Sequence, residues 1–105
     1  FRPLLIAVLR RFFAALAERD GASLVHCLAG KDRTGLAVAL VHHLLGVHRD
    51  DLFADYLLTN SAGNIERRIA AGAGTVRSNF GWSMEEGAVR TLMSVHEDYL
   101  TTAFA

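Results

Sequence analysis

The chain has 105 residues, of which 51% are hydrophobic and 21% charged, a composition typical of one packed domain and not of a disordered chain. Its 11 basic and 11 acidic residues cancel, which argues against a surface that binds nucleic acid or an anionic membrane. One cysteine, Cys27, excludes an internal disulfide and a zinc site built from several cysteines, and no apolar run reaches the roughly 18 residues of a membrane span.

The N-terminal part of the chain predicts a helix followed by a strand. Pro3 suits the first turn of a helix, and Gly21 is typical of the position just after a helix end. Between them apolar residues recur at helical spacing, namely Leu5, Leu9, Phe12 and Leu16. Residues 22–27 are a short apolar segment, which predicts a strand buried on both faces.

The middle of the chain predicts two more helices. Residues 33–45 are apolar around most of a helical circumference, so we expect a central and buried helix there. Asp50 or Asp51 is suited to cap the helix that follows.

The C-terminal part predicts two helices separated by a loop. Residues 64–71 form the first, and the glycine-rich residues 72–81 are expected to be the loop. Ser83 and Glu86 have the spacing of a capping box, which opens a final amphipathic helix that includes Leu100.

About five helices and one clear strand predict an α/β fold with a central, mostly parallel sheet flanked by helices. A strand buried on both faces needs neighbours on each side to pair its backbone groups. The absence of an initial methionine agrees with an incomplete chain. We therefore expect residues 1–105 to be a single partial domain, whose sheet a companion fragment or second chain completes.

The stretch that carries chemistry lies between the predicted strand and the second helix. Five residues separate Cys27 from Arg33, a span that can wrap so that its backbone N–H groups point inward. Such a nest, closed by a helix N-terminus, binds a tetrahedral dianion such as phosphate or another oxyanion. The predicted phosphate-binding residues are Leu28, Ala29, Gly30, Lys31, Asp32 and Arg33.

Cys27 in this loop is the predicted nucleophile. The helix dipole and the inward N–H groups favour its thiolate, which can attack phosphorus to give a phosphocysteine that water then hydrolyses. Arg33 can hold two phosphate oxygens with its planar guanidinium, and the Thr34 hydroxyl can donate to the sulfur. His26 is expected to brace the loop. This chemistry needs no metal and no organic cofactor.

The run His-Cys-Leu-Ala-Gly-Lys-Asp-Arg-Thr-Gly, which ends at Gly35, resembles the signature of the cysteine-dependent protein tyrosine phosphatase superfamily, in particular its bacterial tyrosine phosphatase B-like group. The likeness continues through residues 36–40 and 55–60. It implies a tyrosine-phosphatase-type fold and a phosphorylated protein as substrate. Members with Lys and Asp in the loop often also accept phosphoserine, phosphothreonine or a phosphoinositide. Gly35 belongs to the signature as structural support.

The acid that protonates the leaving group is either Asp32 or a residue of a missing segment. An aspartate beside a dianion is disfavoured as a charge, so Asp32 would keep the proton that a general acid requires. Lys31 adds a second positive charge at the rim of the pocket, or it simply pairs with Asp32 at the surface.

Several alternatives stay open at this point. The alternative to the enzyme is a phosphate-binding pseudophosphatase, in which the loop holds anions but no general acid completes the reaction. Sulfur transfer or arsenate reduction on a similar loop is a further alternative, which a single cysteine disfavours. Residues 61–83 lie outside the likeness and are expected to form a lid or insertion. Arg67 and Arg68 lie either on a solvated helix face or on a patch of that lid that contacts substrate. The sequence leaves the compartment open between cytoplasmic and secreted.

Overall fold

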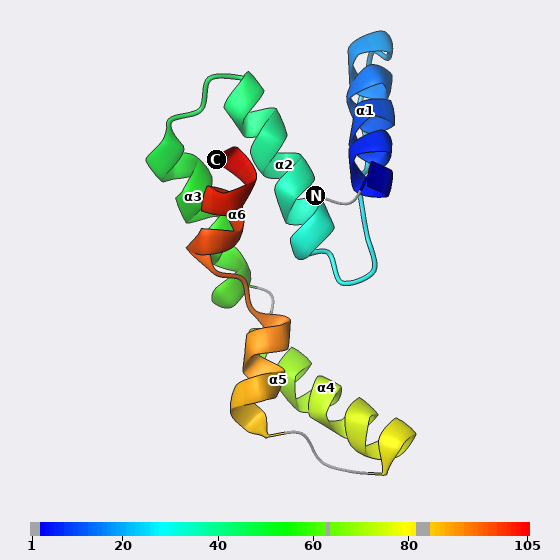
Figure 1. The fold of residues 1–105 in the computed structure, drawn as a ribbon, viewed down its shortest axis with the longest axis vertical. Coiled ribbons are helices and arrows are strands. Elements are labelled where there is room, and N and C mark those ends of the chain that lie inside the picture. Colours follow the sequence, from blue (N-terminus) through cyan, green and yellow to red (C-terminus); the bar gives the residue numbers. More distant parts are fainter. Residues whose placement is uncertain (1–2, 63, 82–84) are drawn as a thin grey trace.

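The computed structural model describes residues 3–62, 64–81 and 85–105, and within these ranges the chain is helical (Figure 1). The elements are α1 (Pro3–Glu18), α2 (Asp32–Leu44), α3 (Arg49–Leu57), the short 3-10 helix η1 (Leu58–Asn60), α4 (Ile65–Phe80), α5 (Glu86–Met93) and α6 (Glu97–Phe104). None of the described helices is long and apolar enough to cross a membrane.

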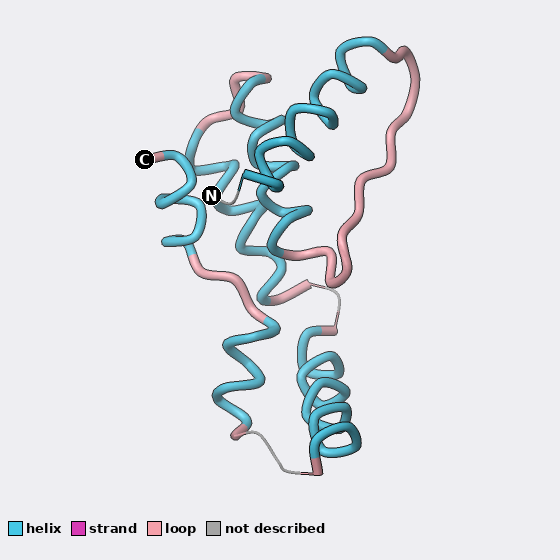
Figure 2. The backbone as a smooth tube through the Cα atoms, turned by 45° about the vertical axis from the view of Figure 1, so that its right-hand side comes forward, coloured by secondary structure: helices cyan, strands magenta, loops and turns pink. Residues whose placement is uncertain are grey.

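The predicted α/β fold with a central parallel sheet is wrong, because the described residues contain no strand (Figure 2). Residues 22–27 instead belong to the loop that runs from the end of α1 back to the start of α2, and Leu24 is 90% exposed there. An extended segment becomes a strand only when a second backbone pairs with its N–H and C=O groups. No such pairing occurs in the described part of the chain.

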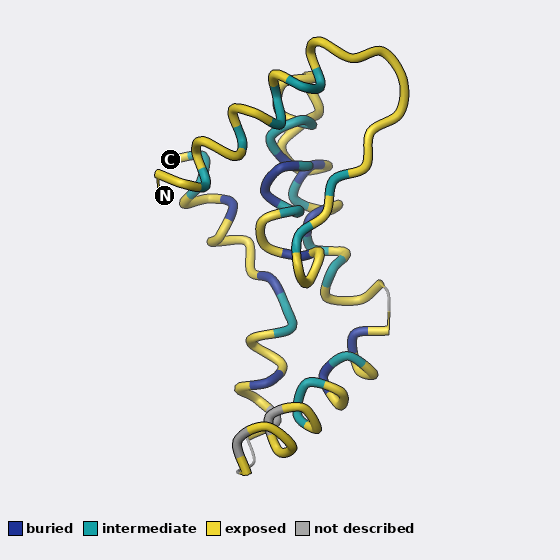
Figure 3. Tube along the Cα trace, turned by 90° about the vertical axis from the view of Figure 1, so that its right-hand side faces the viewer, coloured by how far each residue is buried: buried dark blue, intermediate teal, exposed yellow. Residues whose placement is uncertain are grey.

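The first hydrophobic core joins α2, α3 and α6. Its buried members are Leu36, Ala39, Leu52, Tyr56, Val95 and Leu100. Helix α2 was predicted to be central and buried; residues 34–42 are buried or half-buried, whereas Leu44 at its end is 70% exposed. Helix α1 has no buried residue (Figure 3). Its half-buried Leu5 and Leu9 pack against this core.

The second core lies between α4 and α5. It consists of Ile65, Ile69 and Val89, with Ala73 and Met93 packed against them. A bidentate ion pair, in which the Arg90 guanidinium lies 2.7 and 2.9 Å from the two carboxylate oxygens of Glu66, also joins the two helices.

The prediction of a loop at residues 72–81 is wrong, because α4 continues to Phe80. Gly81 caps the end of the helix with a left-handed φ of 69°. The packing of α5 explains why glycine does not break this helix. A Cβ added at Gly72 would lie 2.5 Å from the Cε of Met93, so the glycine lets α5 come close. Burial of the shared apolar face outweighs the helix propensity that glycine loses.

The predicted final helix is divided into α5 and α6 by the turn at Ser94 and Val95. Asn60 holds this turn with two hydrogen bonds, because its Nδ2 donates to the Val95 carbonyl oxygen and its Oδ1 accepts from the Val95 N–H, both at 2.8 Å. Ser83 of the predicted capping box lies outside the described residues.

Two histidines cap helices. The sequence had predicted an aspartate cap at the first of these helices and an uninterrupted helix at the position of the second. His48 accepts from the backbone N–H of Asp50 at 3.2 Å and caps α3, so Asp50 and Asp51 lie in the first turn and not at the cap. His96 accepts from the N–H of Asp98 at 3.1 Å and starts α6.

The two cores make the molecule elongated, as Figures 1 and 3 show. Its principal extents are 47 × 27 × 27 Å, and its radius of gyration is 15.8 Å. A compact chain of this length has a radius of gyration of about 13 Å. The α4–α5 hairpin therefore projects from the body formed by α1, α2, α3 and α6.

The contact between Gly35 and Tyr56 yields a stability prediction. A Cβ at Gly35 would lie 2.9 and 3.2 Å from two ring atoms of Tyr56, which is buried. Gly35→Ala should therefore lower the free energy of unfolding by about 1–2 kcal/mol, because overpacking outweighs the gain in helix propensity. Gly74→Ala is the matched control: nothing lies near its added Cβ, so the same substitution should raise stability by about 0.5–1 kcal/mol. Urea midpoints measure both, and equal stabilisation would contradict this packing of α2 on α3.

Candidate active site

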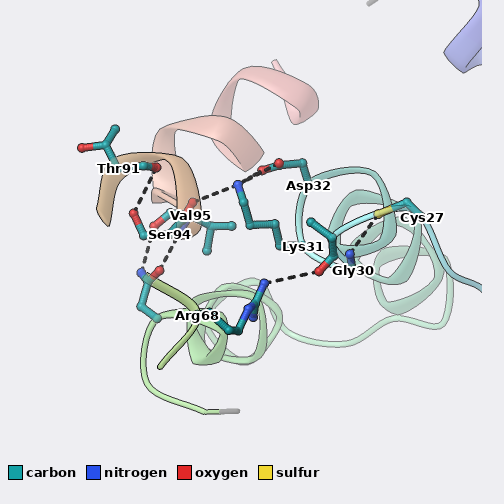
Figure 4. A network of polar contacts seen from close by, with 10 residues as sticks. Cys27, Gly30, Lys31, Asp32, Arg68, Thr91, Ser94 and Val95 are labelled. Atoms are coloured by element: carbon teal, nitrogen blue, oxygen red, sulfur yellow. Dashed lines mark hydrogen bonds and ion pairs between the residues drawn. The ribbon is translucent and has the colours of Figure 1, made fainter. Parts of the chain in front are cut away.

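The phosphate-loop candidate, residues 27–33, joins the extended loop to the N-terminus of α2. The loop turns at Gly30, whose φ of 70° is a conformation that favours glycine. The Gly30 N–H donates to Cys27 Sγ at 3.2 Å (Figure 4). Asp32 and Arg33 are the first two residues of α2, so the cysteine lies where the first helical turn has unpaired N–H groups.

These contacts lower the pKa of the Cys27 thiol to about 7. Partial burial of the sulfur acts in the opposite direction and raises the pKa. The Thr34 side chain and the backbone amides of Thr34, Gly30 and Lys31 stabilise the thiolate and outweigh the burial. The Thr34 hydroxyl oxygen is buried and has no hydrogen-bond partner among the described residues, so its proton is available to the sulfur.

Cys27, Arg33 and Thr34 line one cavity of about 390 Å³. Its other lining residues are mostly apolar and come largely from α1: Leu4, Leu5, Val8, Leu9, Phe12, Val25, His26 and Ala37. Cys27, Arg33 and Thr34 therefore border a space with a hydrophobic wall, and Arg33 also lines a second cavity, together with Asp32. Such a space suits a group with a charged end and an apolar body.

Lys31 does not line this cavity. Its side chain is buried, with the residue 7% exposed, and its Nζ lies 2.9 and 2.8 Å from Oδ1 and Oδ2 of Asp32. The same Nζ donates to the Ser94 carbonyl oxygen at 3.2 Å, so the lysine points away from Cys27 toward the turn between α5 and α6 (Figure 4). Lys31 and Asp32 do pair, but the pair ties the loop to a distant turn and the lysine is not at the surface.

The other predicted residues lie in or beside the loop. His26 Nδ1 is 3.3 Å from the carbonyl oxygen of the adjacent Cys27 and donates to it in the tautomer with its proton on Nδ1. Leu28 is 94% exposed, so only its backbone can contribute to the loop. In the described ranges no three His, Cys, Asp or Glu side chains are grouped as a metal ion would require.

Three contacts at the site or its supports were not predicted from the sequence, although Arg68 itself had been named as a candidate. Arg68 of α4 donates from Nη2 to the Ala29 carbonyl oxygen at 3.3 Å, whereas its neighbour Arg67 is exposed. Ser94 binds Lys31, and Asn60 holds the turn beside Ser94. These contacts join residues 35 to 63 positions apart, and no local pattern predicts them.

Comparison with known proteins gives two kinds of match. A family model described as "Tyrosine phosphatase family" matches residues 5–105. Triple specificity protein phosphatase PtpB of Mycobacterium tuberculosis is 56% identical over 39 residues, which cover 37% of this chain and 14% of that protein. A tyrosine-protein phosphatase of Nostoc commune is 44% identical over 43 residues, 41% of this chain and 15% of the relative. The aligned segments thus span a small part of these relatives, and no solved structure matches.

The state of Cys27 can be tested by alkylation with iodoacetamide as a function of pH. The rate should rise with pH through about 7, because the thiolate reacts and the thiol does not. Thr34→Val keeps the side-chain shape and removes the hydroxyl, so it should slow alkylation at pH 6 by about two- to tenfold, with the rates converging above the shifted pKa. Thr91→Val in α5 is the control and should not change the profile. A Thr34→Val profile identical to that of the parent would contradict the role given to this hydroxyl.

Proposed function

This chain belongs to the tyrosine phosphatase family, and we propose from this premise that it hydrolyses phosphate monoesters through a phosphocysteine formed on Cys27. The observation that supports the proposal best is a thiol with a pKa of about 7 on the same cavity as Arg33. A thiolate at neutral pH is a strong nucleophile, and a guanidinium beside it can bind two oxygens of a phosphate.

The first step transfers the phosphoryl group to the enzyme. The Cys27 thiolate attacks phosphorus, an S–P bond forms, and the ester P–O bond breaks with its electron pair on the leaving oxygen. Asp32 donates a proton to that oxygen. Arg33 and the loop amides hold the other phosphate oxygens throughout.

The second step regenerates the enzyme. Water attacks phosphorus and gives its proton to the Asp32 carboxylate, while the S–P bond breaks and the sulfur leaves as thiolate. The Thr34 side chain and the amides that lower the pKa of Cys27 also stabilise the departing thiolate. Inorganic phosphate is the product.

Asp32 can serve as the acid only after its present partner moves. Its carboxylate is held by Lys31 at 2.8 Å, and its side chain, 57% exposed, lines a second cavity that shares Arg33 with the Cys27 cavity. Because Lys31 points away from Cys27, the lysine must turn toward the loop to meet a bound dianion, which its charge favours because phosphate carries more charge than a carboxylate. We propose that substrate binding opens this pair. A pair that stays closed would instead leave a phosphate-binding pseudophosphatase.

The cavity favours phosphotyrosine among the candidate substrates. Its apolar wall from α1 can contact an aryl ring, while the charged groups lie at Cys27 and Arg33. Phosphoserine and phosphothreonine have no ring, and the inositol ring of a phosphoinositide is polar and not aromatic, so none of them matches this wall as an aryl ring does. A highly charged phosphoinositide headgroup would gain from the Lys31 charge, but the Asp32 carboxylate and the Ser94 carbonyl oxygen already bind the lysine in the structure. We therefore rank these substrates second.

The nucleophile is tested by Cys27→Ser. The substitution should lower the rate of p-nitrophenyl phosphate hydrolysis, measured in EDTA, by about three orders of magnitude or more, because serine is not ionised at neutral pH. Vanadate or sulfate binding to the parent serves as a control for an intact loop. Equal hydrolysis by parent and variant would overturn the mechanism, and tight oxyanion binding without turnover by the parent would identify a pseudophosphatase.

The acid is tested by the dependence on the leaving group. Asp32→Asn should lower kcat by about 10²- to 10⁴-fold for phenyl phosphate, whose leaving group needs a proton, and far less for p-nitrophenyl phosphate. Asp51→Asn, at an exposed position of α3, is the matched control and should change neither rate. An equal loss on both substrates would assign Asp32 a structural role.

A further inference from the structure

The peptide unit between Ala29 and Gly30 is held at both of its edges. On one side the Gly30 N–H donates to Cys27 Sγ at 3.2 Å, and on the other the Ala29 carbonyl oxygen accepts from Arg68 Nη2 at 3.3 Å (Figure 4). The two groups belong to one planar unit, and the described residues contain no cis peptide bond, so the N–H and C=O point in opposite directions. The bond from Arg68 therefore fixes the direction of the N–H that faces the sulfur.

The orientation of this peptide unit depends on a hydrogen bond from outside the loop. Ala29 and Gly30 are exposed, and Gly30 has the left-handed φ of 70°. Glycine populates several backbone regions at similar free energy, so little within the loop itself prevents rotation of the unit. Once rotated, the unit would present its carbonyl oxygen to the thiolate, which would destabilise the negative charge.

Arg68 is well placed to supply that hydrogen bond. It is half-buried on α4, and Ile65 and Ile69 on either side of it in sequence are buried in the core of the α4–α5 hairpin. The Glu66–Arg90 ion pair holds the same turn of α4 to α5. The guanidinium thus extends from a packed helix to an exposed loop.

We propose that Arg68 is a positioning residue for the nucleophile: by binding the Ala29 carbonyl it keeps the Gly30 amide directed at Cys27 and so maintains the thiolate. The inference deepens the proposed function and rests on it for the identity of the nucleophile. It gives the α4–α5 hairpin a direct influence on the reactivity of a residue about forty positions earlier in the chain.

The test is the pH profile of Cys27 alkylation by iodoacetamide in Arg68→Met, Arg68→Lys and Arg67→Ala. Arg68→Met keeps the apolar stem and removes the donors, and it should slow alkylation at pH 6 by about two- to tenfold by raising the apparent pKa. Arg68→Lys should restore part of the rate because it keeps a charged donor. Arg67→Ala removes an equal charge from the adjacent, exposed position and should leave the profile unchanged.

Repeating the measurement in 1 M NaCl separates orientation from simple charge. A long-range effect of the guanidinium charge is screened at this ionic strength, whereas a hydrogen bond that orients a peptide is largely retained. The proposal is overturned if Arg68→Met titrates as the parent does, if Arg67→Ala shifts the profile equally, or if high salt abolishes the difference. Thermal melting by circular dichroism shows whether each variant is folded. If Arg68→Met does not fold, the alkylation profile of Arg68→Lys is the test, and a profile equal to that of the parent at pH 6 would overturn the proposal.

The two proposals fail in distinguishable ways. Alkylation requires no turnover, so a parent that titrates near pH 7 but hydrolyses no aryl phosphate contradicts the proposed function alone. An active parent whose Arg68 variants titrate unchanged contradicts the positioning role alone.

Discussion

A sulfur that is partly removed from water can carry a negative charge at neutral pH only if hydrogen-bond donors compensate for the lost hydration. At Cys27 these donors are the Thr34 side chain and three backbone amides, and the direction of a backbone N–H is set by the orientation of its peptide plane. The backbone conformation of the loop therefore determines how strongly it stabilises the negative charge of the thiolate. The start of α2, the left-handed Gly30 and the bond from Arg68 all determine the direction of N–H groups around one atom.

The buried Lys31 imposes a second constraint on the same loop. An ammonium group is stable out of water only when acceptors surround it, and here the Asp32 carboxylate and the Ser94 carbonyl provide them. Ser94 is itself positioned by the turn that Asn60 holds through Val95. The geometry of the loop thus depends on residues from α3 onward, and not only on the segment that contains the signature.

The features that were predictable from the sequence are those that depend on residues close together in the chain. Helices α1, α2 and α3 and the residues of the loop were predictable, because helical periodicity and the spacing from Cys27 to Gly35 are local properties. The sheet was predicted from the apolar character of residues 22–27, but pairing requires a second strand, which the described residues do not provide. The continuation of α4 through its glycines depends on α5, and the partners of Lys31 and Ala29 are distant in sequence.

The two hydrophobic cores share no residue, so the hairpin of α4 and α5 and the body that carries Cys27 are each stabilised largely by their own packing. Units connected in this way can move relative to each other at a smaller free-energy cost than that of unfolding either one. Two polar contacts link the hairpin and its following turn to the phosphate loop, Arg68 to Ala29 and Lys31 to Ser94. A displacement of the hairpin would therefore act on the thiolate and on Asp32 together, because it would release the peptide that faces the sulfur and the lysine that holds the acid.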